Sequence, residues 1–334
     1  MKNKSQNSVF GNVLWKFSER ITAQMVSLVV SIVLARIIAP SDYGIIAVVT
    51  IFITIANVFV SDGLGSALIQ KKNADALDFS SVLYFNIAMS VLLYLLIFFA
   101  APYITAFFGS GYEALTMVLR VMGLRLVLSA INSIQQAYVT RKMIFKKFFV
   151  ATLLGTVVSA VVGIYMAYEG FGVWALVAQY LTNTTVDTVV LAISLRKLPI
   201  LQFSIGRLKS LLGFGLRVLG MNLLIACYEQ FKSLIIGKTY SSADLAYFTR
   251  GRQFPELIIT NINSSISSVL FPKLSQDQDD VRKIKDVMKM SIKLCTYIMC
   301  PMMLGLAAVS HNFVIVILTE KWLPSVPIFQ MACL

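Results

Sequence analysis

The chain has 334 residues and a mean hydropathy of +0.78, with 57% hydrophobic residues, 13% charged residues and a formal net charge of +13. This composition excludes an ordinary soluble globular domain. The apolar runs are long enough for helices that cross about 30 Å of hydrocarbon, which excludes a barrel built from strands of about ten residues. The sequence therefore predicts an all-α membrane protein, a polytopic helical bundle that leaves no room for a soluble domain.

The predicted spans follow one another through short connections. Pro40 cannot continue a helix, so it marks a tight turn after which Ser41 or Asp42 would cap the second span. Gly63 and Gly65, at the end of that span, allow bending or close contact with another helix. The expected spans lie at about 18–38, 43–67, 79–101, 113–140, 148–168, 172–195, 209–237, 244–270 and 286–310, and a tenth begins near 324.

Further along the chain, Gly170 and Gly172 mark another short turn, and Pro255 and Pro301 interrupt the eighth and ninth spans. A proline inside a helix removes a backbone hydrogen bond, so we expect a kink at each. Such kinks serve either as structural features or as bending points of a carrier. The four cysteines lie in apolar runs without a C-x-x-C pair, which predicts buried free thiols.

The basic residues are distributed asymmetrically over the connections. Twenty of the 29 Lys and Arg residues fall in alternate segments, at 1–20, 68–80, 141–147, 196–209 and 271–293. The other set of connections holds only Arg36, Lys238 and Lys321. Because short cytoplasmic loops retain Lys and Arg, we expect a multi-pass protein of the bacterial inner membrane with a cytoplasmic N-terminus. Topology also accounts for the positive charge, so no nucleic-acid partner is predicted.

The chain repeats itself at an offset of 202 residues. The matching pairs are Arg36 and Lys238, Asp42 and Asp244, Ser66 and Ser268, Leu68 and Leu270, Lys71 and Lys273, and Asp75 and Asp277. Six predicted spans separate the copies, an even number, so both copies would enter the membrane in the same direction, as in carriers with parallel repeats. Chance identity is the alternative.

This repeat predicts two six-helix lobes related by a parallel pseudo-two-fold axis. Residues 1–202 would form the N-terminal lobe, and residues 203–334 a partial C-terminal lobe with spans 7–9 and the start of span 10. We expect this second lobe to be truncated, and a chain truncated in this way to be unable to transport by itself.

Six basic residues lie inside the predicted spans, where a charge at the bilayer centre costs roughly 2.5–3.5 kcal/mol. Guanidinium groups hold phosphate oxygens in a bidentate fashion, so we interpret these residues as the lining of a cationic cavity for an anionic substrate. The candidate substrate-binding residues are Arg120, Arg125, Arg217, Arg250, Arg252 and Lys232. The candidates for coupling an ion or proton gradient are Asp62, Glu229 and Glu256.

Local ion pairs are the alternative for part of this set. Glu229 and Lys232 are spaced i,i+3 and Arg252 and Glu256 i,i+4, so each pair would also be neutralised on its own helix. No carboxylate lies three or four residues from Arg120 or Arg125, which favours a cavity role for these two. The amides of Asn132, Gln135, Gln136, Gln179 and Asn183 would equally line a sugar path or join helices.

Several long stretches resemble a known family. They are LARIIAPSDYGIIAVVTIFITIANVFVSDGLGSALIQKK, IQQAYVTRKMIFKK, LIIGKTYSSADLAYFTRG, SSVLFPKLSQ and TEKWLPSVPIFQ. They are similar to bacterial polysaccharide flippases of the Wzx type, especially the WzxC-like branch of the multidrug/oligosaccharidyl-lipid/polysaccharide exporter superfamily. The resemblance covers nearly all of the chain and implies a MATE-like and MurJ-like fold. Members look like proteins of twelve to fourteen helices, and this chain holds fewer.

The resemblance implies a carrier that moves undecaprenyl-pyrophosphate-linked oligosaccharide repeat units across the inner membrane for surface polysaccharide synthesis. It implies membrane lipids and a polymerase or export machinery as partners, and no cofactor, metal or catalytic residue. A MATE-type drug or cation antiporter is the first alternative, although six basic and four acidic residues in the spans argue against it. A membrane polymerase or ligase is the second alternative, but the outer connections contain no carboxylate–histidine cluster that would support it.

Overall fold

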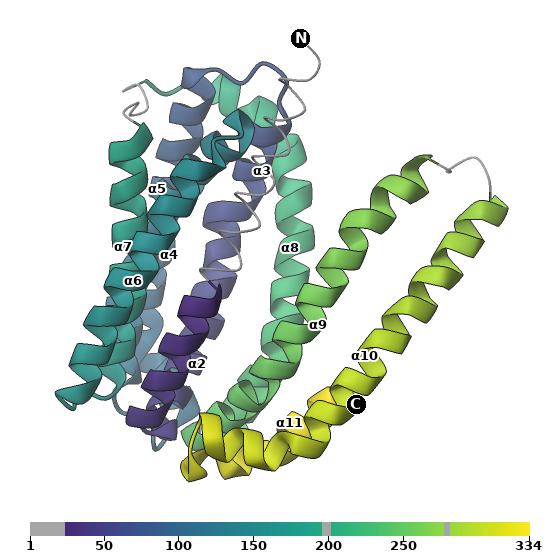
Figure 1. Ribbon diagram of the computed structural model, residues 1–334. Helices are drawn as coiled ribbons and strands as arrows, with labels where there is room; N and C mark the ends of the chain where they lie inside the picture. Colours follow the sequence, from purple (N-terminus) through teal and green to yellow (C-terminus); the bar gives the residue numbers. More distant parts are fainter. Residues whose placement is uncertain (1–23, 196–201, 277–280) are drawn as a thin grey trace. The chain divides into compact units, whose positions relative to one another are not determined.

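The computed structural model describes residues 24–195, 202–276 and 281–334, and every regular element in these ranges is a helix (Figure 1). The protein is thus an all-helical polytopic membrane protein, as the sequence predicts. Some predicted features lie outside the described residues: the basic connection 1–20, parts of the basic connections 196–209 and 271–293, and Asp277 of the repeat.

The helices follow the predicted spans, and most of their ends extend beyond the predicted ones by up to seven residues. They are Gln24–Ile37, α2 (Pro40–Asn57), η1 (Val58–Asp62), α3 (Gly63–Gln70), α4 (Ala76–Phe108), α5 (Leu115–Lys142), α6 (Phe145–Tyr168), α7 (Val173–Leu195), α8 (Ile205–Thr239), α9 (Ser242–Gln276), α10 (Val281–Ile317), η2 (Glu320–Ser325) and α11 (Val326–Cys333). Within the described residues, seven helices are long and apolar enough to cross a membrane, with α2, η1 and α3 counted as one. The predicted eighth span, α9, is a helix of 35 residues but is not among these seven.

Two local predictions from the sequence are wrong. The second span begins with Pro40 as its first residue and Ala39 as its cap, without a side-chain capping bond, so neither Ser41 nor Asp42 caps it. Proline suits the first helical position because the N–H that it lacks has no partner there.

All four cysteines are free, but only Cys333 is buried, so the predicted burial of the thiols is wrong for the other three. The predicted turn near Gly170 is confirmed, and its glycines adopt φ angles of +80° and +54° that other residues rarely adopt.

The second span changes its winding at η1, a five-residue π-helical turn that ends at Asp62. A π turn holds more residues than an α turn and so rotates the side chains that follow it. Gly63 comes directly after it and approaches α8 closely: a Cβ atom on Gly63 would lie 2.9 Å from the carbonyl oxygen of Gly215. The predicted close helix contact at Gly63 is therefore confirmed.

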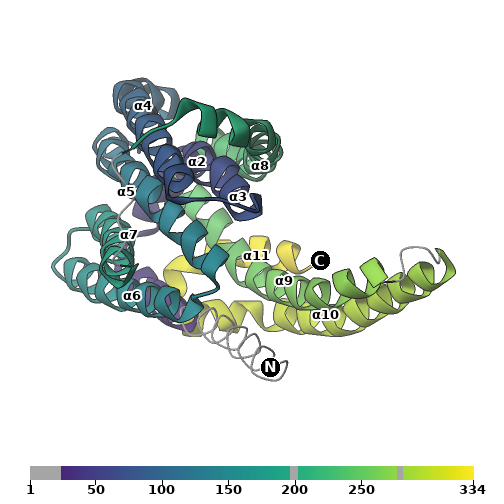
Figure 2. The ribbon, with the colours of Figure 1, turned by 90° about the horizontal axis from the view of Figure 1, so that it is seen from above.

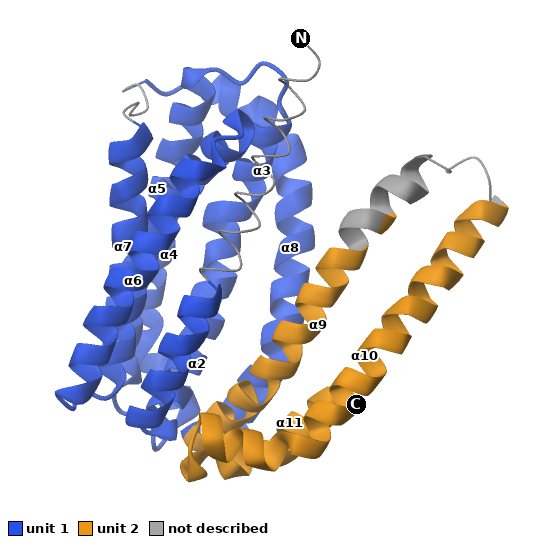
Figure 3. Ribbon diagram, in the orientation of Figure 1, with its two compact units in different colours: residues 1–242 blue, residues 243–334 orange. Residues whose placement is uncertain are grey.

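The chain divides into two compact units, residues 1–242 and 243–334 (Figure 3). In unit 1, α6 packs along α7, α4 along α5, and α5 also contacts α7 (Figure 2). The helix α8 packs against α2, η1, α3 and α4 of the same unit. In unit 2, Trp322 is fully buried beside Tyr247, and Phe254, Phe313 and Phe329 form an aromatic cluster with ring centroids 5.1–6.3 Å apart.

A charged cluster joins the α3–α4 connection to α8. Asp78 is fully buried, and its carboxylate lies 2.7 Å from Lys71 Nζ and 3.8 Å from Arg207 Nη1. Asp75 caps α4 through a reciprocal capping box with Asp78 and lies 3.2 Å from Arg207 Nη2. Arg141, at the end of α5, donates to the carbonyl oxygens of Leu68 and Lys72, at 2.9 and 2.7 Å. We call Lys71, Asp75, Asp78, Arg141 and Arg207 the α3–α4 cluster.

Candidate functional site

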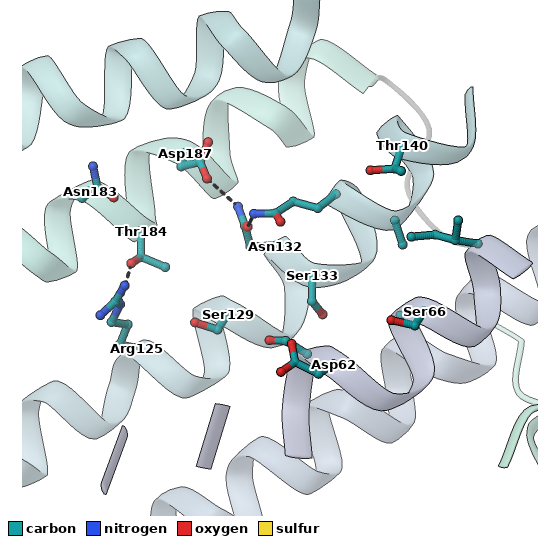
Figure 4. Close-up of a pocket in the computed structure, with 15 residues that line it drawn as sticks. Asp62, Ser66, Arg125, Ser129, Asn132, Ser133, Thr140, Asn183, Thr184 and Asp187 are labelled. Carbon is teal, nitrogen blue, oxygen red and sulfur yellow. Dashed lines mark hydrogen bonds between the residues drawn. The ribbon is translucent and has the colours of Figure 1, made fainter. Parts of the chain in front are cut away.

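Unit 1 contains a polar cavity of about 410 Å³ between the second span, α5 and α7 (Figure 4). Its lining holds one guanidinium, two carboxylates and many hydroxyl and amide groups, which is unusual for the interior of a membrane helix bundle. The lining residues are Ser61, Asp62, Gly65, Ser66, Ile69, Arg125, Ser129, Asn132, Ser133, Gln136, Ala137, Thr140, Asn183, Thr184 and Asp187. We call this space the unit 1 cavity.

Arg125 supplies the only positive charge among the residues that line this cavity. It lies ten residues into α5, about 15 Å from the start of the helix at 1.5 Å per residue. Its Nε atom donates to Thr184 Oγ1 at 3.0 Å, and its guanidinium carbon lies 5.4 Å from the centroid of the Tyr180 ring. The ion pairs found among the described residues do not include Arg125. Its charge thus has hydroxyl and aromatic neighbours and no paired carboxylate.

The Asp187 side chain extends from α7 into the cavity and is hydrogen-bonded to a side chain of α5. Asn132 Nδ2 donates to Asp187 Oδ2 at 3.0 Å, and Gln136 donates in turn to Asn132 Oδ1. Within the described part of the chain, the second carboxylate oxygen of Asp187 is buried and accepts no hydrogen bond. A buried acceptor of this kind has strong capacity to bind a donor, a water molecule or a cation.

Asp62 lines the cavity from the opposite side, where the π turn ends (Figure 4). A second cavity of about 230 Å³ also includes Asp62 and Arg125 in its lining and continues along α2 to Thr50. Asn57, on the same wall, has a buried side-chain oxygen that accepts no hydrogen bond from the described residues. Asp62 and Arg125 therefore lie where the two cavities adjoin.

The spacing of polar residues explains why these side chains share one space. Along α5, Arg125, Ser129, Asn132, Gln136 and Thr140 are spaced i, i+4, i+7, i+11 and i+15, which places them on one face of the helix. Along α7, Asn183, Thr184, Asp187 and Thr188 form a similar polar face. The two faces meet, as the bond from Arg125 to Thr184 and that from Asn132 to Asp187 demonstrate.

Of the predicted site residues, the structure brings Arg125 and Asp62 together. Arg120 does not line either cavity; its Nε atom donates to the Phe98 carbonyl oxygen at 3.3 Å, and its guanidinium carbon lies 4.4 Å from the Phe98 ring centroid. Arg217, Glu229 and Lys232 are exposed on α8, away from both linings.

The remaining candidates belong to unit 2. Arg252 and Glu256 form the i,i+4 ion pair that the sequence offered as their alternative. Arg250 is 8% exposed, with a hydrogen bond to Gln253 and its guanidinium carbon 5.8 Å from the Trp322 ring centroid. Both arginines are thus engaged by neighbours on or near their own helix.

The sequence-based prediction missed Asp187, Thr184, Ser129 and Ser66 as site residues. The signal was present, because a polar face repeating at helical spacing through a membrane span is itself a sign of an internal cavity. Asn132, Gln136 and Asn183 were predicted either to line a path or to join helices, and Asn132 does both.

The cavity suits a hydrated, polar occupant. Its volume equals that of roughly 14 water molecules at about 30 Å³ each. Arg125 favours an anionic group, whereas Asp62 and Asp187 favour a cation or a proton. Within the described residues, no group of three or more His, Cys, Asp or Glu side chains is placed to hold a metal ion.

Sequence comparison gives a match to the family model described as "Polysaccharide biosynthesis protein" over residues 33–327. Among curated proteins, the chain is 25% identical over 327 residues to the succinoglycan biosynthesis transport protein ExoT of Rhizobium meliloti, covering 98% of this chain and 66% of that protein. It is 22% identical over 303 residues to the lipopolysaccharide biosynthesis protein WzxC of Escherichia coli, covering 90% of this chain and 61% of that protein. The chain spans less than two thirds of the length of these relatives.

The fold is also found in solved structures of transporters. The lipid II flippase MurJ in an inward closed conformation matches with a TM-score of 0.76 at 14% identity, covering 95% of this chain and 71% of that one. An inward-facing multidrug resistance MATE family transporter of the MOP superfamily matches with a TM-score of 0.68 at 17% identity, covering 93% and 76%. The predicted MATE-like and MurJ-like fold is confirmed, and the resemblance is to transporters, as the sequence indicates, rather than to enzymes.

Proposed function

Since the chain belongs to the polysaccharide biosynthesis protein family, we propose that it acts as a flippase for undecaprenyl-pyrophosphate-linked oligosaccharide repeat units. The flippase would move these units across the bacterial inner membrane for surface polysaccharide synthesis. Two relatives are named for transport or synthesis of such polysaccharides, and MurJ is named for flipping lipid II. Membrane lipids and a polymerase or export machinery are the proposed partners.

The observation that carries this proposal is Arg125 inside the unit 1 cavity. A guanidinium in the middle of a span is costly unless water or an anion accompanies it. Arg125 has only a hydroxyl and an aromatic ring as described partners, so its charge remains available to an anionic group. The pyrophosphate of a lipid-linked sugar is such a group, and the hydroxyl and amide groups around it suit sugar hydroxyls.

Helix ends support the proposed parallel lobes, residues 1–202 and 203–334. The first described helix ends at Ile37 and α8 at Thr239, and the next helices begin at Pro40 and Ser242. Both pairs keep the offset of 202 that relates Arg36 to Lys238 and Asp42 to Asp244. Alternating access would then move one lobe against the other around a central site. The distribution of Lys and Arg supports a cytoplasmic N-terminus.

Within this mechanism, we assign Arg125 to the anionic part of the cargo and Asp62 to ion or proton coupling. Asp187 joins Asp62 as a coupling candidate because one of its buried oxygens accepts no described hydrogen bond. Roles for Arg120, Arg217, Arg250, Arg252, Lys232, Glu229 and Glu256 stay predictions.

The test uses cells from which the gene has been deleted. Deletion should cause lipid-linked oligosaccharide to accumulate, inaccessible to a membrane-impermeant glycosidase, with loss of surface polysaccharide. Re-expression of the wild-type gene should restore glycosidase access and surface polysaccharide. Normal outward exposure of the lipid-linked sugar in the deletion strain, with no second flippase gene expressed, would overturn the proposal.

The second candidate, a cation antiporter, is favoured by the two carboxylates in the same cavity. It predicts efflux of cationic dyes from overexpressing cells, and loss of that efflux when Asp62 and Asp187 are changed to Asn. Under the flippase proposal, dye efflux should stay at the level of cells without the protein.

A further inference from the structure

A row of basic residues on α10 takes no part in the unit 1 cavity. The first third of this helix carries Arg282, Lys285, Lys289 and Lys293, spaced i, i+3, i+7 and i+11. At about 100° per residue these four side chains lie on one face of the helix. All four are exposed. We call them the α10 basic stripe.

The opposite face of the same segment is turned inward. Ile284, Val287 and Ser291 are half-buried, whereas their immediate neighbours in sequence are exposed. These three positions are spaced i, i+3 and i+7, and their mean direction lies about 170° from that of the basic stripe. The stripe therefore lies on the more exposed side of this helical segment.

The length of α10 places the stripe at the membrane surface. The helix has 37 residues, about 55 Å, although about 30 Å is enough to cross the hydrocarbon. Residues 294–317 contain no Asp, Glu, Lys or Arg and already span about 36 Å. The preceding residues thus extend beyond the hydrocarbon, with Lys293 and Lys289 at the depth of the headgroups and Lys285 and Arg282 further out.

Exposed apolar residues flank the stripe. Met290 is 73% exposed and Ile292 is 61% exposed, on either side of the lysines. A soluble anionic partner would leave these side chains in water, whereas a lipid interface accepts apolar side chains and basic groups together. Asp286 is the only acidic residue between 281 and 293, so the segment is strongly cationic.

We propose that the α10 basic stripe binds the phosphate headgroups of anionic phospholipids in the leaflet that borders the start of α10. Lysine ammonium groups and lipid phosphates attract each other without strict geometry, and the attraction falls off over a Debye length of about 8–10 Å. The two lysines nearest the hydrocarbon therefore contribute more than Lys285 and Arg282. This proposal does not depend on the proposed transport function.

The test measures which lipids lie beside the stripe. The protein, with its four cysteines replaced and Met290→Cys labelled with a fluorophore, is placed in nanodiscs that contain brominated phosphatidylglycerol or brominated phosphatidylcholine. At equal mole fraction, brominated phosphatidylglycerol should quench the fluorophore more strongly, and the preference should weaken as salt is raised. K289Q/K293Q should lower the preference by roughly fivefold for each lysine, and R282Q/K285Q should lower it less.

Two controls separate charge from folding. K289R/K293R keeps the charges and should keep the lipid preference, and Lys283→Gln removes a basic residue outside the stripe and should change it little. Equal quenching by both lipids would overturn the proposal. An unchanged lipid preference in K289Q/K293Q would also overturn it. If that variant also lost transport, the stripe would serve the cargo instead of the lipid.

Discussion

Two regions of α5 use charge in opposite ways. At Arg125, the guanidinium points into the unit 1 cavity and has a hydroxyl and a ring for neighbours. At Arg141, sixteen residues later, the guanidinium binds backbone carbonyls at the end of α3 and in the segment after it. The nearby Asp78 is fully buried and paired with Lys71 and Arg207.

The difference separates function from structure. Charges of the α3–α4 cluster bind one another or backbone carbonyls and hold helix ends together, so their loss should reduce stability. Charges of the cavity have partners that are neutral or incomplete, so their loss should reduce transport while the fold remains. The predictions below test this division.

The largest expected effect is on transport by Arg125→Gln. Removing the charge removes the group assigned to the anionic cargo, and charge-assisted hydrogen bonds are worth about 1.5–3 kcal/mol, so flipping should fall about tenfold or more. Arg120→Gln is the matched control, because Arg120 lies on the same helix but contacts Phe98 outside the cavities. If the cargo contacts only the cavity face of α5, this variant should lose less activity than Arg125→Gln in the glycosidase-access assay. Equal losses of flipping in both variants would contradict the special role of the cavity arginine.

The next effect is on stability, in Asp78→Asn. Removing one partner of a buried ion pair leaves Lys71 without its buried counter-charge and typically costs about 3–5 kcal/mol. Thermal unfolding of the purified protein should show a large drop in Tm. Asp75→Asn, at a half-exposed carboxylate in the same cluster, should cost clearly less. A Tm for Asp78→Asn equal to that of the wild type would contradict the structural role of the cluster.

A smaller loss is expected where the second span meets α8. A side chain at Gly215 would lie 3.0 Å from Leu64 Cδ2 and 3.3 Å from the Gly63 carbonyl oxygen. Gly215→Val should therefore destabilise the packing by about 1–3 kcal/mol. A Cβ atom on Gly213, two residues earlier, would meet no atom within 4 Å, so Gly213→Val should change the free energy of unfolding by less than about 0.5 kcal/mol. Thermal unfolding compares the two variants, and similar Tm losses in both would show that the contact at Gly215 does not decide the loss.

The smallest effect concerns pH. The hydrogen bond from the Asp78 backbone N–H holds the pKa of Asp75 below its usual value, and the nearby Arg207 adds to this. Because the folded-state pKa is lowered, the ionised carboxylate stabilises the fold above the unfolded-state pKa of about 3.9. That stability is lost as pH falls through the lower folded-state pKa. Unfolding followed from pH 6 to pH 3 should show a shallower decline for Asp75→Asn than for the wild type; parallel curves would contradict this.

The sequence predicts the helices well and the site only partly. Long apolar runs and the prolines and glycines between them define α4 to α8 to within seven residues, because crossing a membrane imposes a minimum length on each helix. Local spacing also identifies the ion pair of Arg252 and Glu256. Partners far apart in sequence could not be predicted: Asn132 meets Asp187 and Arg120 meets Phe98 only through helix packing. No feature of the sequence predicts the π turn at η1, which ends at Asp62 in the cavity wall.

The most direct test of the account is whether the cargo enters the unit 1 cavity. Ser129→Cys, in a chain whose native cysteines are replaced, puts a thiol on the cavity face of α5 between Arg125 and Asn132. We predict that a small hydrophilic thiol reagent labels it in membranes, and that undecaprenyl-pyrophosphate-linked oligosaccharide slows the labelling in proportion to occupancy. Protection should disappear when Arg125→Gln is added. Labelling at the same rate with and without the lipid-linked sugar, under conditions where flipping is observed, would contradict the assignment of this cavity to the transport path.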